Sequence, residues 1–158
     1  MSGPLPSAVD LAGYVSAERV VVLDEALGKR EALSRLIDVT MVHPLVTDKA
    51  GFAKAIHDRE EVTSTGIGGG VAVPHARLAS INGFVITIGI FPKGIDFSSQ
   101  DRHPVHVAVM IAATDQDRKT YLMVLATVAA RLRTPRLVQH LLAALPDRQR
   151  VADLFLGR

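Results

Sequence analysis

One histidine in this 158-residue chain stands in a setting suited to chemistry. His75 lies between Pro74 and Ala76, at the end of a short apolar run that follows a glycine-rich turn. A neutral imidazole is a good nucleophile toward a phosphoryl group, because an ordinary pKa of about 6.5 leaves most of the ring unprotonated at pH 7. Pro74 restrains the backbone that leads to the ring. We therefore interpret His75 as a phosphoryl acceptor; the alternative is a structural histidine that is hydrogen bonded to the backbone.

Two arginines near His75 in sequence are candidates for stabilising the charge of a phosphohistidine. A guanidinium carries several donors in a fixed geometry that suits phosphate oxygens. Arg59 is the better candidate, because we expect it at the end of a helix, just before the loop EEVTSTG and within reach of the same rim. Arg77 is a second candidate, although its side chain can equally be solvated.

Four glycines precede His75 and invite a phosphate-loop interpretation: Gly66, Gly68, Gly69 and Gly70. No Gly-Lys-Ser/Thr follows them, and the next residues predict a strand and not a helix, so the pattern does not indicate a nucleotide-binding loop. Two interpretations remain: a hairpin or bulge that needs positive φ, and a turn that also presents N–H groups to a phosphoryl group on His75. Ser64 and Thr65 can each donate a hydroxyl to phosphate, although Ser and Thr beside Gly are more often turn residues.

Other catalytic and metal-binding patterns find little support. His103 and His106 form the segment HPVH, but residues three apart on a strand point to opposite faces, and no carboxylate or third histidine stands at ligand spacing. We expect no metal and no cofactor. The sequence has no cysteine and no G-x-S-x-G, which argues against acyl transfer. The last three histidines are expected to be surface or packing residues without partners: His43, His57 and His140.

The composition predicts one compact domain over residues 1–158, with a core at about residues 8–156. Apolar residues make up 48% of the chain, enough for a proper core. A net charge of +2 gives no basic block for nucleic acid, and the lack of cysteine suits a reducing compartment. The start, MSGPLPSAVDLAGYV, has no basic leader, and no apolar run reaches the roughly 18 residues of a membrane span. We therefore expect a soluble, cytoplasmic protein without direct membrane insertion.

Apolar patterns predict the order β-α-α-β-β-β-α-α-α. Strands are expected at residues 19–23, 71–73, 84–91 and 105–112, and helices at 29–42, 48–58 and through the final third. In that last part we expect one helix with an apolar stripe, a second opened by Pro135 and a third at 151–156; the stripe comprises Leu122, Leu125, Ala126, Ala129 and Leu132. Strands without polar alternation are usually covered on both faces, which predicts a small sheet between helices.

The segment REEVTSTGIGGGVAVPHAR, residues 59–77, closely resembles the signature of the IIA domains of the bacterial phosphoenolpyruvate:sugar phosphotransferase system (PTS). The resemblance is to the fructose/mannitol branch, which includes the nitrogen-regulatory IIA protein, and it extends over nearly the whole chain. It implies an α+β fold, a three-layer α/β/α sandwich with a small mixed sheet. It also implies that Nε2 of His75 accepts a phosphoryl group from the phosphohistidine of an HPr-like or NPr-like carrier, and that Arg59 steadies the phosphate.

The chain departs from the family pattern at one position. Members commonly carry a second histidine near the start of the long helix, and the aligned residue here is Tyr121. A tyrosine can donate a hydrogen bond to a phosphoryl oxygen but cannot become a cation. Tyr121 is therefore either part of the site or a packing residue at the helix edge.

The resemblance leaves three roles open. Transport members pass the phosphoryl group to a IIB domain and then to sugar, whereas nitrogen-branch members stop at the histidine and regulate target proteins. No IIB or membrane domain accompanies this sequence, which favours a nitrogen-branch regulator. The alternatives are a detached IIA subunit of a fructose/mannitol-type transporter and a IIA-like binding module that carries no phosphate.

Overall fold

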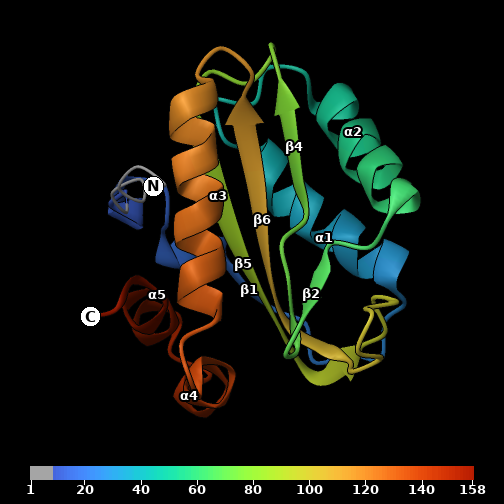
Figure 1. Ribbon diagram of the computed structural model, residues 1–158, viewed down its shortest axis with the longest axis vertical. Helices are drawn as coiled ribbons and strands as arrows, with labels where there is room; N and C mark the ends of the chain where they lie inside the picture. The colour runs from blue at the N-terminus through green and yellow to red at the C-terminus, as the bar shows by residue number, and fades with distance from the viewer. Residues whose placement is uncertain (1–8) are drawn as a thin grey trace, which may run out of the picture.

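The computed structural model describes residues 9–158, which form a six-stranded sheet between two layers of helices (Figure 1). One face is covered by α1 (Lys29–Met41) and α2 (Lys49–Val62), and the other by α3 (Arg118–Leu132), α4 (Leu137–Ala144) and α5 (Arg148–Leu156). The predicted fold class and three-layer sandwich are confirmed. The predicted start of the core, at residue 8, and the residues before it, where we expected no basic leader, lie outside the described residues. None of the helices within residues 9–158 has the length and apolar composition needed to cross a bilayer.

The sheet is mixed, as predicted. Its strands are β1 (Val20–Val22), β2 (Gly66–Gly68), β3 (Val71–Ala72), β4 (His75–Leu78), β5 (Phe84–Ile95) and β6 (Val105–Thr114). The strand order is β1-β5-β6-β3-β2, and β4 follows β3 along the same edge of β6. The pairs β5–β6 and β2–β3 are antiparallel, and the pairs of β6 with β3 and with β4 are parallel.

Two short strands, β2 and β4, were not predicted. The segment Gly-Ile-Gly of β2 is too short and too rich in glycine to show an alternating pattern. The strand β4, HARL, is half polar and owes its extended form to pairing with β6. The strand predicted at 84–91 continues to Ile95, because an irregular register between Ile90 and Ile95 accommodates Pro92 and Gly94. The helix predicted to open at Pro135 begins two residues later, at Leu137.

The two faces of the sheet bury alternate residues of the central strand β6. Val107, Val109 and Ile111 pack beneath α3, α4 and α5. Ala108 and Met110 face α1 and α2. Because β6 is buried on both sides, it is held rigidly, and the strand β4 that pairs with it is held in place as well.

The second helix is longer than predicted. We expected α2 to end at about Asp58, with Glu60 in a loop, but α2 continues to Val62. Glu is a good helix former, and the segment after the helix folds back so that Thr65 binds the Glu60 carboxylate. Arg59 therefore lies in the last turn of α2.

The apolar stripe predicted on α3 is only partly correct, since Leu132 is buried and Leu125 packs against the core, but two of its other members are exposed. The buried residues of this helix are Val124, Val128 and Leu132, whereas Leu122 is 48% exposed and Ala126 is also exposed. The segment from residue 121 to 130 is apolar almost all round, so periodicity cannot select one face. Packing selects the face that turns Tyr121 toward the sheet, where it contacts the core beneath α3.

Candidate functional site

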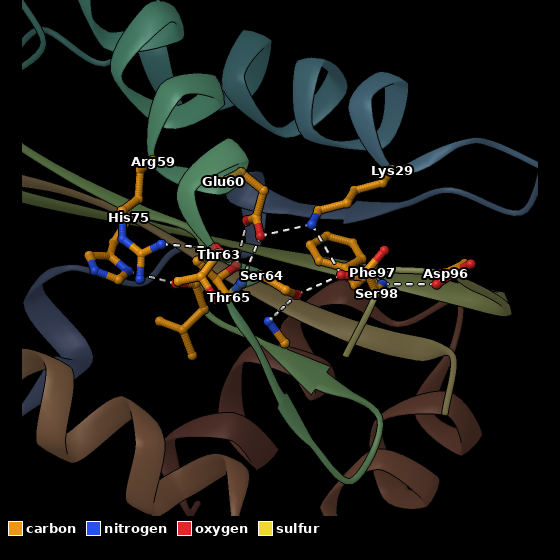
Figure 2. Close-up of polar contacts among 12 residues, drawn as sticks. Lys29, Arg59, Glu60, Thr63, Ser64, Thr65, His75, Asp96, Phe97 and Ser98 are labelled. Atoms are coloured by element: carbon orange, nitrogen blue, oxygen red, sulfur yellow. Dashed lines mark hydrogen bonds and ion pairs between the residues drawn. The ribbon is translucent and has the colours of Figure 1, made fainter. Parts of the chain in front are cut away.

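His75 begins β4 at an open edge of the sheet. Among the described strands β4 pairs only with β6, where His75 lies opposite Ile111 in parallel register. Residues paired in this way point to the same face, and Ile111 packs beneath α3. The His75 side chain therefore points toward α3, while the end of α2 approaches the same strand edge (Figure 2).

The hydrogen bond of His75 fixes its tautomer. Nδ1 lies 2.7 Å from the carbonyl oxygen of Val73, across the rigid Pro74. A carbonyl can only accept, so Nδ1 carries the proton and donates it. In the neutral ring Nε2 therefore holds the free lone pair. The ring is half-buried and not enclosed.

Burial is the main cause that lowers the pKa of His75 from its ordinary value. The bond to Val73 raises this pKa, the positive charge of Arg59 lowers it, and the carboxylate of Glu60 raises it. Burial prevails, so the imidazole is neutral at pH 7 and Nε2 is available as a nucleophile.

Arg59 is brought to His75 by the last turn of α2. Its guanidinium lies beside the imidazole (Figure 2), and Nη1 donates to the carbonyl oxygen of Thr63 at 2.9 Å. That carbonyl follows the helix end, where a cation is favourable. The structure thus places together the histidine and the guanidinium that the sequence nominated.

A buried carboxylate that sequence reasoning missed organises the segment after α2 (Figure 2). Glu60 Oε2 lies 2.9 Å from Lys29 Nζ and accepts from the Thr65 N–H at 2.6 Å. Its Oε1 accepts from the Thr65 hydroxyl at 2.6 Å. Lys29 Nζ also donates to the carbonyl of Phe97 at 3.1 Å. The sequence alone does not show that Glu60 is buried and its neighbour Glu61 exposed. This difference arises only because α1 packs against one side of α2.

Ser64, Thr65 and Gly66 lie near His75 in sequence, but their polar groups are bonded elsewhere. The Thr65 hydroxyl donates to Glu60, as described above. Ser64 Oγ donates to the carbonyl of Phe97 at 2.5 Å and accepts from the Gly66 N–H at 3.0 Å. A Cβ at Gly66 would lie 2.0 Å from Ser99 Oγ, so a larger residue here would have to displace the buried Ser99 side chain. The three residues hold the turn in place, and their predicted contact with phosphate stays a prediction.

The other glycines form a hairpin turn between β2 and β3. Gly68, Gly69 and Gly70 have φ angles of 87°, 68° and 81°, in the left-handed region that favours glycine. The Gly69 N–H donates to the carboxylate of Asp101 at 2.9 Å. This agrees with the first of the two interpretations from the sequence, a hairpin that needs positive φ.

Tyr121 and Arg77 complete the surroundings of His75. The rings of Tyr121 and His75 have centroids 6.4 Å apart at an interplanar angle of 45°. The guanidinium carbon of Arg77 lies 4.4 Å from the centroid of the Tyr121 ring. Burial raises the pKa of the Tyr121 phenol, whereas the charges of Arg77 and Arg59 lower it. Tyr121 is thus half-buried between the helix and β4 as a neutral phenol.

The remaining histidines lie apart from this cluster. His106 donates from Nδ1 to the carbonyl of Phe91 at 3.0 Å, and His103 is exposed. His57 and His43, expected to be without partners, bind Ser34 Oγ at 3.2 Å and the Leu45 N–H at 3.1 Å. Within residues 9–158 no group of three or more His, Asp or Glu side chains is placed to hold a metal ion.

A cleft of about 680 Å³ lies between the glycine hairpin and the α3–α4 turn. It contains His103 and His106, but not His75, Arg59 or Tyr121. The chemistry inferred for His75 does not need an enclosed cavity, because a donor protein must bring its own reactive group to the ring. The open edge at β4 fits that requirement better than the cleft.

The sequence profile described as "Phosphoenolpyruvate-dependent sugar phosphotransferase system, EIIA 2" matches residues 14–155, nearly the whole chain. The chain belongs to this family. It is therefore an EIIA phosphocarrier domain, a phosphotransferase component of the PTS, as the resemblance implied.

The relatives of this EIIA domain fall into a transport and a regulatory group. It is 33% identical over 120 residues to the PTS system fructose-specific EIIABC component of Bacillus subtilis (strain 168), covering 76% of this chain and 19% of that protein. It is 28% identical over 146 residues to the nitrogen regulatory protein of Klebsiella oxytoca, covering 90% and 88%. The chain thus spans about one fifth of the first relative and most of the second.

Solved structures show the same fold. The complex of enzyme IIAMtl and phosphorylated enzyme IIBMtl from Escherichia coli matches this EIIA domain with a TM-score of 0.76 and 21% identity, over 91% of this chain and 98% of that one. At this identity the match concerns the fold alone.

Proposed function

We propose that this EIIA domain accepts a phosphoryl group on Nε2 of His75 from an HPr-like or NPr-like phosphocarrier. The observation that carries the proposal is the hydrogen bond from Nδ1 to Val73, which leaves Nε2 as the free nitrogen of a neutral ring beside the Arg59 guanidinium. The open edge of β4 supports it, because a donor histidine needs access along the surface. Nothing in this chemistry requires a metal.

The transfer exchanges one N–P bond for another. The Nε2 lone pair of His75 attacks phosphorus, and the bond from phosphorus to the donor imidazole breaks with its electron pair returning to that ring. The Nδ1 proton of His75 stays on the ring, where its bond to Val73 favours the positive charge that the phosphorylated ring carries. Arg59 offers donors to the equatorial oxygens, on which the charge of a loose transition state lies.

Arg59→Gln is expected to slow phosphoryl acceptance by about tenfold to a hundredfold, because one charge-assisted contact with the phosphoryl group is lost. Its bond to Thr63 is exposed, so the melting temperature should barely change. Arg59→Lys should recover part of the rate, since it keeps the charge without the planar fork. The matched control is Arg30→Gln on α1, an arginine that is 73% exposed in a long ion pair with Glu61. Equal rates for both glutamine variants in a quenched-flow assay would contradict the role of Arg59.

Exposed apolar residues on the elements that flank His75 favour docking of a protein partner. Val62 at the end of α2 is 82% exposed, Ile67 on β2 is 45% exposed, and Leu122 follows Tyr121 on α3. Apolar side chains around a reactive group are the usual core of a protein interface. We infer that the carrier contacts this rim.

Val62→Glu is expected to raise the KM for the carrier about tenfold, because a charge must then be desolvated at the interface, while kcat stays within twofold. The control is Val42→Glu, since Val42 is 68% exposed but follows α1, next to the start of α2 and not to the end that carries Arg59. Steady-state kinetics with varied carrier concentration separate the two constants. A rise in KM of the same size in both variants would remove the case for this rim.

Of the two groups of relatives, we propose the regulatory one for this chain. The nitrogen regulatory protein is 28% identical over most of both chains. A fructose-specific EIIA component of Haloferax volcanii matches over a similar share, 92% of this chain and 94% of that protein, but is 24% identical. Transport is the second candidate, favoured by the higher identity to the fructose-specific component of Bacillus subtilis. In that case the phosphoryl group passes from His75 to a IIB domain. A phosphorylated protein that loses its label to a fructose-type IIB domain belongs to transport; one that retains it belongs to regulation.

The test of phosphoryl acceptance uses phosphoenolpyruvate, the first enzyme of the relay and each carrier in turn, followed by intact mass. The proposal expects a gain of one phosphoryl group that is lost in mild acid, as a phosphoramidate bond requires. No gain with competent upstream proteins would leave a IIA-like binding module, the third role considered above.

A further inference from the structure

The Tyr121 ring packs over two residues of β4. His75 and Arg77 are two positions apart on the strand, so their side chains leave the same face of the sheet. Their partners on β6, Ile111 and Ala113, both belong to the core beneath α3, so this face is the one that α3 covers. From the first turn of α3, Tyr121 reaches both side chains, with its ring centroid 6.4 Å from that of His75 and 4.4 Å from the guanidinium carbon of Arg77.

The guanidinium of Arg77 has few polar contacts of its own. Nη2 donates to the carbonyl oxygen of Asp115 at a long 3.4 Å, and Nε is buried without a hydrogen-bond partner among the described residues. Within residues 9–158 no carboxylate forms an ion pair with Arg77. Besides the long bond to Asp115, the defined contact of this cation among the described residues is the face of the Tyr121 ring, a cation–π arrangement.

The phenol of Tyr121 lies within the reach of both arginines near the site. The charges of Arg77 and Arg59 each lower its pKa, and burial outweighs them and raises it. The hydroxyl therefore stays protonated at neutral pH and can act as a hydrogen-bond donor. The rings of Tyr121 and His75 have centroids 6.4 Å apart, so the phenol and the phosphoryl-accepting imidazole share one neighbourhood.

We propose that Arg77 is a positioning residue that acts through Tyr121: its stacked guanidinium holds the phenol hydroxyl beside His75, where the hydroxyl donates a hydrogen bond to the phosphoryl group. This inference rests on the proposed function of His75. It assigns Arg77 no direct contact with phosphate, in contrast to the expectation from the sequence. The site then combines one fixed cation, Arg59, with one neutral donor, Tyr121.

The experiment uses phosphoramidate as a chemical phosphoryl donor, so that no carrier contact enters the rate, and follows intact mass over time. Tyr121→Phe removes the donor and is expected to slow acceptance about tenfold. Arg77→Gln should cause a similar loss, and Arg77→Lys should recover most of it by restoring the cation over the ring. The double variant Tyr121→Phe/Arg77→Gln should be no slower than Tyr121→Phe alone. The control Arg118→Gln removes an exposed charge from the same helical turn and should react at the wild-type rate.

The outcomes separate this inference from the proposed function. A wild-type rate for Tyr121→Phe would overturn the donor role, and losses that multiply in the double variant would overturn the action of Arg77 through Tyr121. Thermal melts identify a variant that is unfolded. If Arg77→Gln is unfolded, the rates of the two single variants Arg77→Lys and Tyr121→Phe still test the proposal. If neither phosphoramidate nor a competent carrier phosphorylates the wild-type protein, or if His75→Gln gains phosphate equally, the proposed function itself fails.

Discussion

His75→Gln is expected to take up no phosphoryl group from any carrier, whereas the wild-type protein takes up one. Glutamine can keep a hydrogen bond from its amide to the Val73 carbonyl, but its side chain has no nucleophilic lone pair at the place of Nε2. The loss should therefore be complete and not a reduced rate. Intact mass after incubation with phosphoenolpyruvate, the first enzyme and the carrier measures it, and thermal melts should show that the variant is folded.

The chain offers a closely matched control for this variant. His106 is also half-buried, and its Nδ1 donates to a backbone carbonyl, that of Phe91 at 3.0 Å. It differs from His75 in having neither Arg59 nor Tyr121 beside it. His106→Gln should thus accept the phosphoryl group at the wild-type rate. Uptake that survives in His75→Gln and disappears in His106→Gln would move the acceptor to the other histidine.

Glu60→Ala is expected to lower the free energy of unfolding by about 3–5 kcal/mol, a large part of the total stability of a domain of this size. The substitution leaves Lys29 without its carboxylate and leaves the buried Thr65 N–H and hydroxyl without an acceptor. Each of these groups was desolvated on folding, so the cost exceeds that of an exposed ion pair. Urea unfolding monitored by circular dichroism gives the difference, provided that the slope of the transition is unchanged.

Two variants test the physical reason for the effect of Glu60→Ala. Glu60→Gln should be intermediate, because an amide oxygen can still accept from Thr65 but no longer balances the charge of Lys29. Glu61→Ala should change stability by about 0.5 kcal/mol or less, because the Glu61 side chain is 72% exposed and its ion pair with Arg30 is 3.8 Å long. If Glu60→Ala lowers the free energy of unfolding no more than Glu61→Ala does, the contacts of Glu60 with Lys29 and Thr65 do not stabilise the fold.

Local patterns predicted the fold well because they concern neighbouring residues. Residues 29–41 formed the expected helix, since their apolar spacing agrees with one helical face and Pro44 follows. The strands β5 and β6 are long apolar segments, and such segments are typical of strands buried on both faces of a sheet. Patterns failed where the sequence permits several solutions: α3 is apolar almost all round, and β4 is extended only because β6 pairs with it.

The same division holds for the candidate site. The motif of residues 59–77 nominated His75 and Arg59, and the structure places the Arg59 guanidinium beside the His75 ring, where the end of α2 meets the start of β4. Glu60 and Lys29 were not found, because burial of a carboxylate depends on which helix packs against it. The stacking of Arg77 on Tyr121 was not found either, because it depends on the rotation of α3 about its own axis.

By itself, the sequence determined the family and the three-layer architecture, and it nominated His75 as nucleophile and Arg59 as its guanidinium, since a contiguous motif and apolar periodicity carry this information. Only the tertiary structure decided which glutamate is buried and which face of α3 meets the sheet. Each of those features is a contact between segments distant in the chain, or the direction of a side chain within such a contact. Packing of complete elements sets these contacts, and the order of residues in one segment does not encode them.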